Sequence, residues 1–248
     1  MEEALRESET KFRDLAEKSF VGIHIIQDGY FRYVNSRFAE IHGYAVDEIV
    51  NRKVPHDMIL REDLPAVVEK TLRRASGAIK SLHNEFRIVT KNGQIKHVEV
   101  YGTNTVFKGK PATIGAVIDI TERKDAEEAL RKSEEKHRNI FENAVEGIFQ
   151  MSPQGQFLSI NPSLARLFGF ESPEDVIINA NEHQWFFSNS EDAQTLLHLI
   201  ETRGSAEGFE LRHHRKDVKK IWASVNGRAV LDSNGMTAYY EGSVTDIT

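Results

Sequence analysis

Ten histidines are the side chains in this sequence best suited to metal binding or proton transfer, and the chain contains no cysteine. The histidines show no spacing typical of a metal site, such as His-Glu-x-x-His, so the sequence predicts no dedicated metal centre. His213 and His214 are neighbours in a β-prone run, where successive side chains face opposite sides of a sheet and cannot share one ion. The lack of cysteine excludes disulfides, thiolate zinc sites, iron–sulfur clusters and any chromophore bound through a cysteine.

Carboxylates could also serve as catalytic groups. Glu85, Glu99 and Glu210 stand in β-prone runs without a nucleophile or a partner that would complete a catalytic set. No glycine-rich nucleotide-binding loop accompanies them. We therefore expect no catalytic residue in this chain and predict that it is not an enzyme by itself.

An internal repeat organises the whole sequence. Residues 3–15 read EALRESETKFRDL and residues 128–140 read EALRKSEEKHRNI, at an offset of 125. The same offset pairs Gly22 with Gly147, and later anchors drift by one or two residues at loops. These anchors are Gly29 with Gly155, Asn35 with Asn161, Gly43 with Gly169, and Asp119-Ile120-Thr121 with Asp246-Ile247-Thr248. Many anchors in one order indicate two copies of one module.

Each copy has the same predicted order of elements. In the first copy, β-prone runs flank a turn at Asp28-Gly29, and Asn35 is placed to cap a short helix that ends at Gly43. A longer helix follows at about 62–75, and three strands close the copy; the second copy has its longer helix at about 190–203. The order predicts an α+β fold class, in which each copy is a five-stranded antiparallel sheet with helices on one side.

The repeat predicts four segments. They are an N-terminal helix at 1–19, a first domain at 20–121, a helical connector at 122–143 and a second domain at 144–248. Of the 21 residues from Glu122 to Glu142, 13 are charged. The connector's less polar positions are spaced 4, 3, 4 and 3: Ala126, Leu130, Ser133, His137 and Ile140. Such a stripe suits a helix paired with a second copy in a coiled coil, so we predict a homodimer; the alternative is a solvated linker helix.

With these anchors placed, the sequence resembles the PAS family, including its C-terminal PAC segment, across nearly all of both copies. The first copy carries the resemblance through Gly22, Tyr33-Val34-Asn35, Phe38, Gly43-Tyr44, Phe86-Arg87, Asn92-Gly93 and Asp119-Ile120-Thr121-Glu122-Arg123. The second copy carries it through Gly147-Ile148, Ile160-Asn161-Pro162, Leu167-Phe168-Gly169-Phe170 and Asp246-Ile247-Thr248. The resemblance implies two tandem PAS folds.

The resemblance also implies that each copy surrounds a small cavity, where a ligand, a chromophore or a partner signal changes the last strand and the helix after it. A small organic ligand, such as a carboxylate or an aromatic acid, is one candidate for this cavity. The residues expected at such sites are Tyr33, Phe38, Phe86, Trp222 and His198, with hydrophobic core as the alternative role. The residues that match the family's signal-transmission junction are Asp119, Thr121, Asp246 and Thr248, with helix capping as the alternative.

The cofactor stays unknown from sequence. Haem-binding members of the family use a histidine from the long helix before the last three strands. The first copy has none there, and the second has His198, which could equally be a core residue. Non-covalent flavin could stack on Trp185 or Trp222, and the alternative for both indoles is core or interface packing.

The expected function is a sensory, signal-relay and dimerisation module of a bacterial signal-transduction protein. Its output domain, commonly a histidine kinase or a diguanylate cyclase in similar architectures, is expected to follow the second copy. The alternative is a ligand-free protein-interaction scaffold. A net charge of −6 argues against a nucleic-acid partner. With no apolar stretch of about 20 residues and no secretory signal, we expect no membrane span in this segment and a cytoplasmic location.

Overall fold

The computed structural model describes residues 10–11, 14–75, 81–183, 191–217 and 220–248. The chain divides into two compact units, Met1–Leu130 and Arg131–Thr248. Much of the helix expected at 1–19, and Trp185, lie outside the described residues. Within the described part, no helix combines the length and the apolar character that a membrane span requires.

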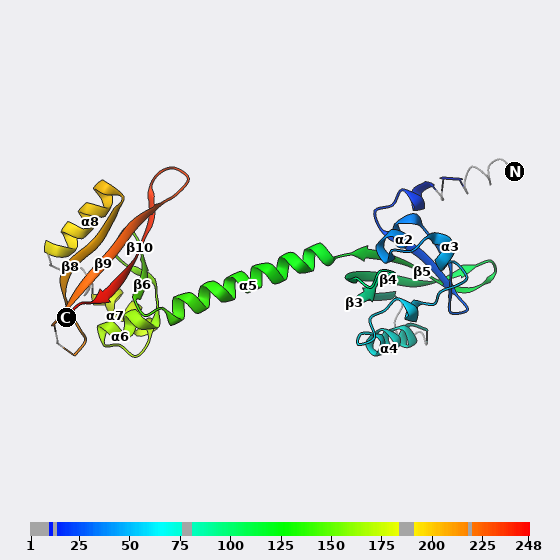
Figure 1. Cartoon of the computed structure of the whole chain (residues 1–248), viewed down its shortest axis with the longest axis horizontal. Coiled ribbons are helices and arrows are strands. Elements are labelled where there is room, and N and C mark those ends of the chain that lie inside the picture. Colours follow the sequence, from blue (N-terminus) through cyan, green and yellow to red (C-terminus); the bar gives the residue numbers. More distant parts are fainter. Residues whose placement is uncertain (1–9, 12–13, 76–80, 184–190, 218–219) are drawn as a thin grey trace. The chain divides into compact units, whose positions relative to one another are not determined.

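Unit 1 is a five-stranded antiparallel sheet with its helices between the second and third strands (Figure 1). The strands are β1 (Gly22–Gln27), β2 (Tyr30–Val34), β3 (Ser81–Val89), β4 (Ile95–Phe107) and β5 (Lys110–Asp119), hydrogen-bonded in the order β2-β1-β5-β4-β3. The helical elements are α2 (Ser36–His42), α3 (Val46–Ile49), the 3-10 helix η1 (Pro55–Asp57) and α4 (Leu64–Ala75).

Unit 2 repeats this arrangement. Its strands are β6 (Gly147–Met151), β7 (Phe157–Ile160), β8 (Ser205–His214), β9 (Lys220–Leu231) and β10 (Thr237–Asp246), in the order β7-β6-β10-β9-β8. Its helices are α6 (Pro162–Phe168), α7 (Pro173–His183) and α8 (Glu191–Arg203). The predicted fold class, two tandem antiparallel sheets with helices, is therefore confirmed.

Local sequence signals explain where the first elements begin and end. Asp28 and Gly29 have φ angles of 53° and 81°, the left-handed pair that a two-residue hairpin requires between β1 and β2. Gly43 and Gly169 end α2 and α6 with φ angles of 74° and 81°. The hydrophobic core of each unit then forms between the sheet and these helices.

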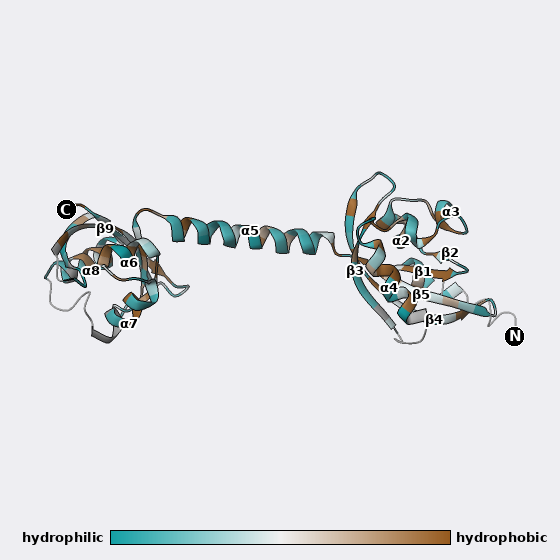
Figure 2. Cartoon of the chain, turned by 90° about the horizontal axis from the view of Figure 1, so that it is seen from below, coloured by the Kyte–Doolittle hydropathy of each residue, from teal (hydrophilic) through white to brown (hydrophobic). Residues whose placement is uncertain are grey.

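Helix α5 (Thr121–Asn143) contains the predicted connector. None of its residues is buried, and Figure 2 shows it hydrophilic along most of its length. Leu130 and Ile140, from the predicted stripe, are 62% and 57% exposed. A helix that is polar on nearly all sides gains little from burial against its own chain.

Candidate functional site

Unit 1 has a cavity of about 430 Å³ between the inner face of its sheet and helices α2 and α4. Its wall is mainly apolar and includes Phe31, Phe38, Met58, Val68, Phe86 and Val100. Cavities of this size and character hold small organic molecules in many proteins.

Two buried histidines, His24 of β1 and His42 at the end of α2, also form this wall. The His24 ring lies so close to Gly115 that a Cβ added there would come within 2.5 Å of it. The His42 ring stacks on Phe38 at a centroid distance of 4.1 Å, and its Nδ1 lies 2.8 Å from the Phe38 carbonyl oxygen. Burial lowers the pKa of His42 to about 4, so this ring is neutral at pH 7.

Unit 2 has phenylalanines at the two corresponding positions. Phe149 lies against Gly242 on the inner face of its sheet, and Phe168 is the last residue of α6. Both are core residues, 6% and 0% exposed. The Phe168 ring contacts the buried His213 at a centroid distance of 4.4 Å. The inner wall of unit 2 is therefore more hydrophobic than that of unit 1 at these two points.

Phe38 and Phe86 line the cavity of unit 1, where the sequence places them. Tyr33 does not: it is half-buried on β2, and its hydroxyl donates to Glu17 at 3.3 Å. The pairing of β1 with β2 contains a register shift, which alters which side chains of β2 face the core. A ligand-binding role for Phe38 and Phe86 stays a prediction.

Trp222 and His198 lie elsewhere than expected. Trp222 is 41% exposed on β9, while its neighbours along the strand on both sides are buried, so it faces away from the core. The Arg212 guanidinium lies 4.8 Å above its ring. His198 is exposed on α8, which turns Leu196 and Ile200 into the core instead. Their expected place in a cavity wall is wrong, because alternation along the strand and the helix period decide which side chains face inward.

The junction between β5 and α5 is held by side chains of the Asp-Ile-Thr tripeptide. The Thr121 hydroxyl donates to Asp119 Oδ1 at 2.6 Å, and its oxygen accepts from the backbone N–H of His97 at 3.1 Å. Asp119 Oδ2 accepts from Lys96 at 2.8 Å. Burial alone would raise the pKa of Asp119, but the hydrogen bonds from Lys96 and Thr121 outweigh it and hold that pKa below its usual value.

The corresponding tripeptide of unit 2 makes the same backbone contacts. Thr248 Oγ1 accepts from the backbone N–H of Trp222 at 3.0 Å, and Asp246 Oδ1 accepts from the Thr248 N–H at 2.9 Å. Hydrogen bonds from the Thr248 side chain and then from its backbone N–H hold the pKa of Asp246 below its usual value. Ile221 stands where unit 1 has Lys96, so this ion pair belongs to unit 1 alone. A role in signal transmission for these residues stays a prediction.

A carboxylate on β3 also holds the first turn of α5. Glu85 lies 3.1 Å from the Arg123 guanidinium and 2.7 Å from Lys124 Nζ. The Lys124 contact lowers the pKa of Glu85. A structural role for Glu85 could not be predicted from the sequence, because its two basic partners lie 38 and 39 residues further along the chain.

Asn35 and Asn161 do more than cap α2 and α6. The Oδ1 atom of each accepts from the helix N–H three residues on, as expected for a cap, and also from a strand N–H. The Nδ2 atom of Asn35 donates to Ala16 and Val21 carbonyls, and that of Asn161 donates to Phe141 and Glu146 carbonyls. Each asparagine is fully buried and ties the segment before its domain to its unit: the helical residues 14–17 in unit 1 and α5 in unit 2.

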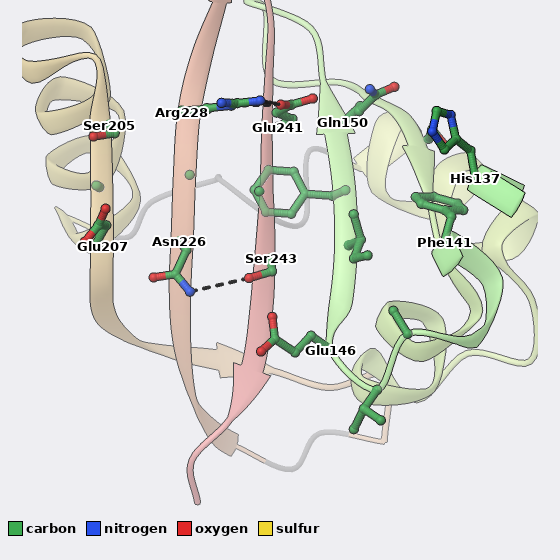
Figure 3. Close-up of a pocket in the computed structure, with 18 of the residues that line it drawn as sticks. His137, Phe141, Glu146, Gln150, Ser205, Glu207, Asn226, Arg228, Glu241 and Ser243 are labelled. Atoms are coloured by element: carbon green, nitrogen blue, oxygen red, sulfur yellow. Dashed lines mark hydrogen bonds and ion pairs between the residues drawn. The ribbon is translucent and has the colours of Figure 1, made fainter. Parts of the chain in front are cut away.

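A second hollow, of about 1090 Å³, lies on unit 2 beside the last turns of α5 (Figure 3). Polar side chains from β9 and β10 line it and contact one another. Arg228 pairs with Glu241 at 2.6 Å, and Asn226 donates to Ser243 at 3.4 Å. Among the residues that the structure describes, no group of three or more potential ligands could hold a metal ion, here or elsewhere.

Two family models match the chain in tandem. A PAS fold matches residues 31–118, and a PAS domain matches residues 145–248. Both units are PAS domains. The resemblance inferred from the repeated anchors is therefore confirmed, and the cavity of unit 1 is the interior of a PAS fold.

The PAS domains of this chain are similar to parts of bacterial histidine kinases. A blue-light-activated histidine kinase from Brucella anthropi is 32% identical over 133 residues, covering 53% of this chain and 26% of that protein. Sporulation kinase A from Bacillus subtilis is 24% identical over 203 residues, covering 82% of this chain and 32% of that kinase. Sporulation kinase E from the same organism is 23% identical over 175 residues, covering 70% and 23%. The chain thus spans about a quarter to a third of these relatives, and they indicate a role in signal transduction.

Solved structures of PAS domains are also similar. The PAS domain of an HTR-like protein from Haloarcula marismortui is 24% identical, with a TM-score of 0.41, and covers 48% of this chain and 97% of that domain. A sensory box histidine kinase/response regulator from Burkholderia thailandensis is 23% identical, with a TM-score of 0.42, and covers 52% of this chain and 98% of that structure.

Proposed function

We propose that this chain is the sensory and relay part of a signal-transduction protein, in which the first PAS domain binds a small molecule and helix α5 carries the change onward. The observation that carries the proposal is the cavity of about 430 Å³ in unit 1. The strand β5 contributes Val117 to its wall and ends at Asp119, whose side chain is bonded to Thr121 at the start of α5. Occupancy of the cavity can therefore act on the strand from which α5 begins.

The second PAS domain has a different part in this proposal. Phe149 and Phe168 fill positions that His24 and His42 hold beside the first cavity, which supports a relay domain with a packed core. A ligand-free interaction scaffold is the alternative for the whole chain, and the packed core of unit 2 is the observation that favours it.

Dimerisation is the second half of the proposed relay. The stripe on α5 leaves Leu130 and Ile140 more than half exposed on a helix with no buried residue. Pairing with a second copy would bury these side chains, as a coiled coil does. We propose a homodimer through α5, in the cytoplasm, with an output domain beyond unit 2. The similarity to histidine kinases supports a kinase as that output.

The lack of cysteine in the chain and the lack of histidine in α4 limit which chromophore the proposed sensor can bind. One relative is named for blue light, but a chain without cysteine forms no cysteinyl–flavin adduct. Haem does not fit the family's usual mode in unit 1, since α4 contains no histidine, and His198 on α8 is exposed. A colourless small molecule is the ligand that these residues favour.

Native mass spectrometry and an absorbance spectrum of the purified chain test the proposal together. We expect a dimer without a Soret or flavin band that either retains a small organic mass or takes one up on titration. Val68→Phe, which places a ring in the cavity from α4, should abolish that uptake. A chain that stays monomeric and binds no small molecule would contradict the proposed sensor and favour the ligand-free interaction scaffold.

A further inference from the structure

The polar groups in the wall of the first cavity limit which molecules it can hold. This inference rests on the proposed role of the cavity as a ligand site. Among the described residues that line it, none is Asp, Glu, Lys or Arg. The polar side chains in the wall are His24, His42, His56, Thr71 and Thr113. Their hydrogen-bonding state therefore decides the chemistry of the site.

His42 presents an acceptor and no spare donor. Its Nδ1 lies 2.8 Å from the Phe38 carbonyl oxygen, which can only accept, so Nδ1 carries the ring proton. Burial keeps the ring neutral at pH 7 by lowering its pKa to about 4. In a neutral imidazole with a protonated Nδ1, Nε2 is an acceptor. A ligand can meet this ring only through a donor of its own.

The Thr71 hydroxyl on α4 already uses its proton in a hydrogen bond. It donates to the Val67 carbonyl one turn earlier at 2.8 Å. Its oxygen can therefore only accept a hydrogen bond from a ligand. Two polar groups from different helices, α2 and α4, thus offer the cavity acceptors.

We propose that the cavity of unit 1 selects uncharged, mainly apolar molecules that carry a hydrogen-bond donor, such as a phenol, an alcohol or an N–H group, and that it rejects carboxylates. The apolar wall matches the body of such a molecule, and its donor pairs with His42 or Thr71. A carboxylate would be buried without a lysine or arginine partner and would face the acceptors of His42 and Thr71, and both effects disfavour it. A neutral donor of this kind differs from the carboxylate and the aromatic acid that served as examples of a small organic ligand in the sequence analysis.

Three ring compounds that differ in one substituent test this selection on the whole chain. They are 4-methylphenol, which has a donor, 4-methylanisole, in which that donor is methylated, and 4-methylbenzoate, which is anionic at pH 7.5. Calorimetric or NMR titration should give at least a roughly tenfold tighter dissociation constant for the phenol than for the anisole, as one hydrogen bond to a buried acceptor supplies. The benzoate should not bind detectably.

Variants assign the effect to the two acceptors. Thr71→Val keeps the side-chain shape and removes the hydroxyl, and His42→Phe copies Phe168 of unit 2. At least one of these variants should raise the dissociation constant of the phenol about tenfold, toward that of the anisole. The same variant should change the dissociation constant of the anisole by less than about twofold. Val68→Phe should abolish binding of both, and Leu197→Phe on α8 of unit 2 should not. If His42→Phe fails to fold, Thr71→Val and the three wild-type affinities still decide the question.

The possible failures are distinct. If none of the three compounds binds the wild-type chain, the proposed ligand-binding function of the cavity is wrong. If the anisole binds as tightly as the phenol, the cavity is a ligand site but not one that requires a donor. If the benzoate binds best and His24→Phe removes that binding, His24 serves as an anion-binding donor and the proposed selection is overturned.

Discussion

The side-chain amide of Asn161, at the start of α6, donates a hydrogen bond to the main-chain carbonyl of Phe141 in the last turn of α5, at 3.0 Å. The same buried side chain accepts from the N–H groups of Ile148 on β6 and Leu164 on α6. One residue therefore joins the incoming helix, the first strand and the first helix of unit 2. A displacement of the end of α5 relative to β6 and α6 would strain these bonds.

Replacing Asn161 by Asp separates these roles. The carboxylate keeps the two acceptor contacts but loses both donor contacts, and it places negative charge beside two carbonyl oxygens. We expect a loss of about 1–3 kcal/mol in the free energy of unfolding of unit 2. Amide exchange should accelerate at residues 141–146, measured by mass spectrometry.

Asn35→Asp is the matched control for this change. It removes the corresponding donors to Ala16 and Val21 in unit 1, so exchange should accelerate at residues 16–21 and stay unchanged at 141–146. Equal amide exchange at residues 141–146 in wild type and Asn161→Asp would mean that Asn161 caps α6 but does not hold the end of α5.

Thr121→Val should loosen the start of α5. The valine keeps the shape but loses the acceptor for the His97 N–H and the donor to Asp119, at a cost of about 1 kcal/mol. Exchange at the His97 amide should accelerate, and Thr121→Ser should restore protection because it retains the hydroxyl. The exposed Thr103→Val on β4 is the control for surface changes. Unchanged protection of His97 in Thr121→Val would contradict the junction described here.

His42 should make unit 1 less stable in mild acid. Its pKa is about 4 in the folded chain and near 6.5 when unfolded, so below pH 6.5 the unfolded state binds a proton that the folded state does not. The free energy of unfolding therefore falls as the pH drops from 6.5 to about 4, by about 3 kcal/mol if the whole shift is realised. Above pH 6.5 the His42 ring is neutral in both states, and protonation of His42 no longer lowers the free energy of unfolding.

Urea unfolding of wild type and His42→Phe between pH 4 and pH 7.5 measures this contribution. The Lys96–Asp119 pair, whose charges also act on His42, is present in both proteins and cancels in the difference. The difference in the free energy of unfolding between the two proteins should change by about 3 kcal/mol between pH 6.5 and pH 4. The free energy of unfolding of His42→Phe should depend less steeply on pH. Parallel curves would show that His42 is not buried as described.

Glu85→Gln should weaken the hold of unit 1 on the first turn of α5. The three side chains are partly exposed, so we expect only a small loss of stability, which shrinks further at high salt. Faster exchange at residues 121–125 in low salt is the more sensitive measure. Glu210→Gln, at the corresponding position of unit 2, is the control and should leave that segment unaffected. An effect of equal size from both variants would rule out a specific contact.

Most of the fold could be read from the sequence, because its signals are local. Asp28-Gly29, Asn35 and Gly43 each act on neighbouring backbone, and the structure has the hairpin, the cap and the helix end that they predict. The cap and the helix end recur in unit 2 at Asn161 and Gly169, whereas five residues separate β6 from β7 where two separate β1 from β2.

The cavity wall could not be read in the same way, because it depends on which face of each element turns inward. Trp222 was expected inside, yet the alternation of Ile221 and Ala223 already marked the opposite face. The pairing of His24 and His42 with Phe149 and Phe168 across the repeat was also visible. Only the structure, however, shows that these four positions face the interior of each unit.

The attachments of α5 at its two ends have a consequence for how such chains arise. Each PAS domain has its own buried asparagine that bonds to the segment before it, and each last strand ends in an Asp-Ile-Thr tripeptide, which in unit 1 begins α5. A repeat of one domain and one helix therefore carries the residues for both attachments of that helix. Repeating it in tandem adds a domain without requiring a new kind of contact, which is consistent with the offset of 125 between the two copies.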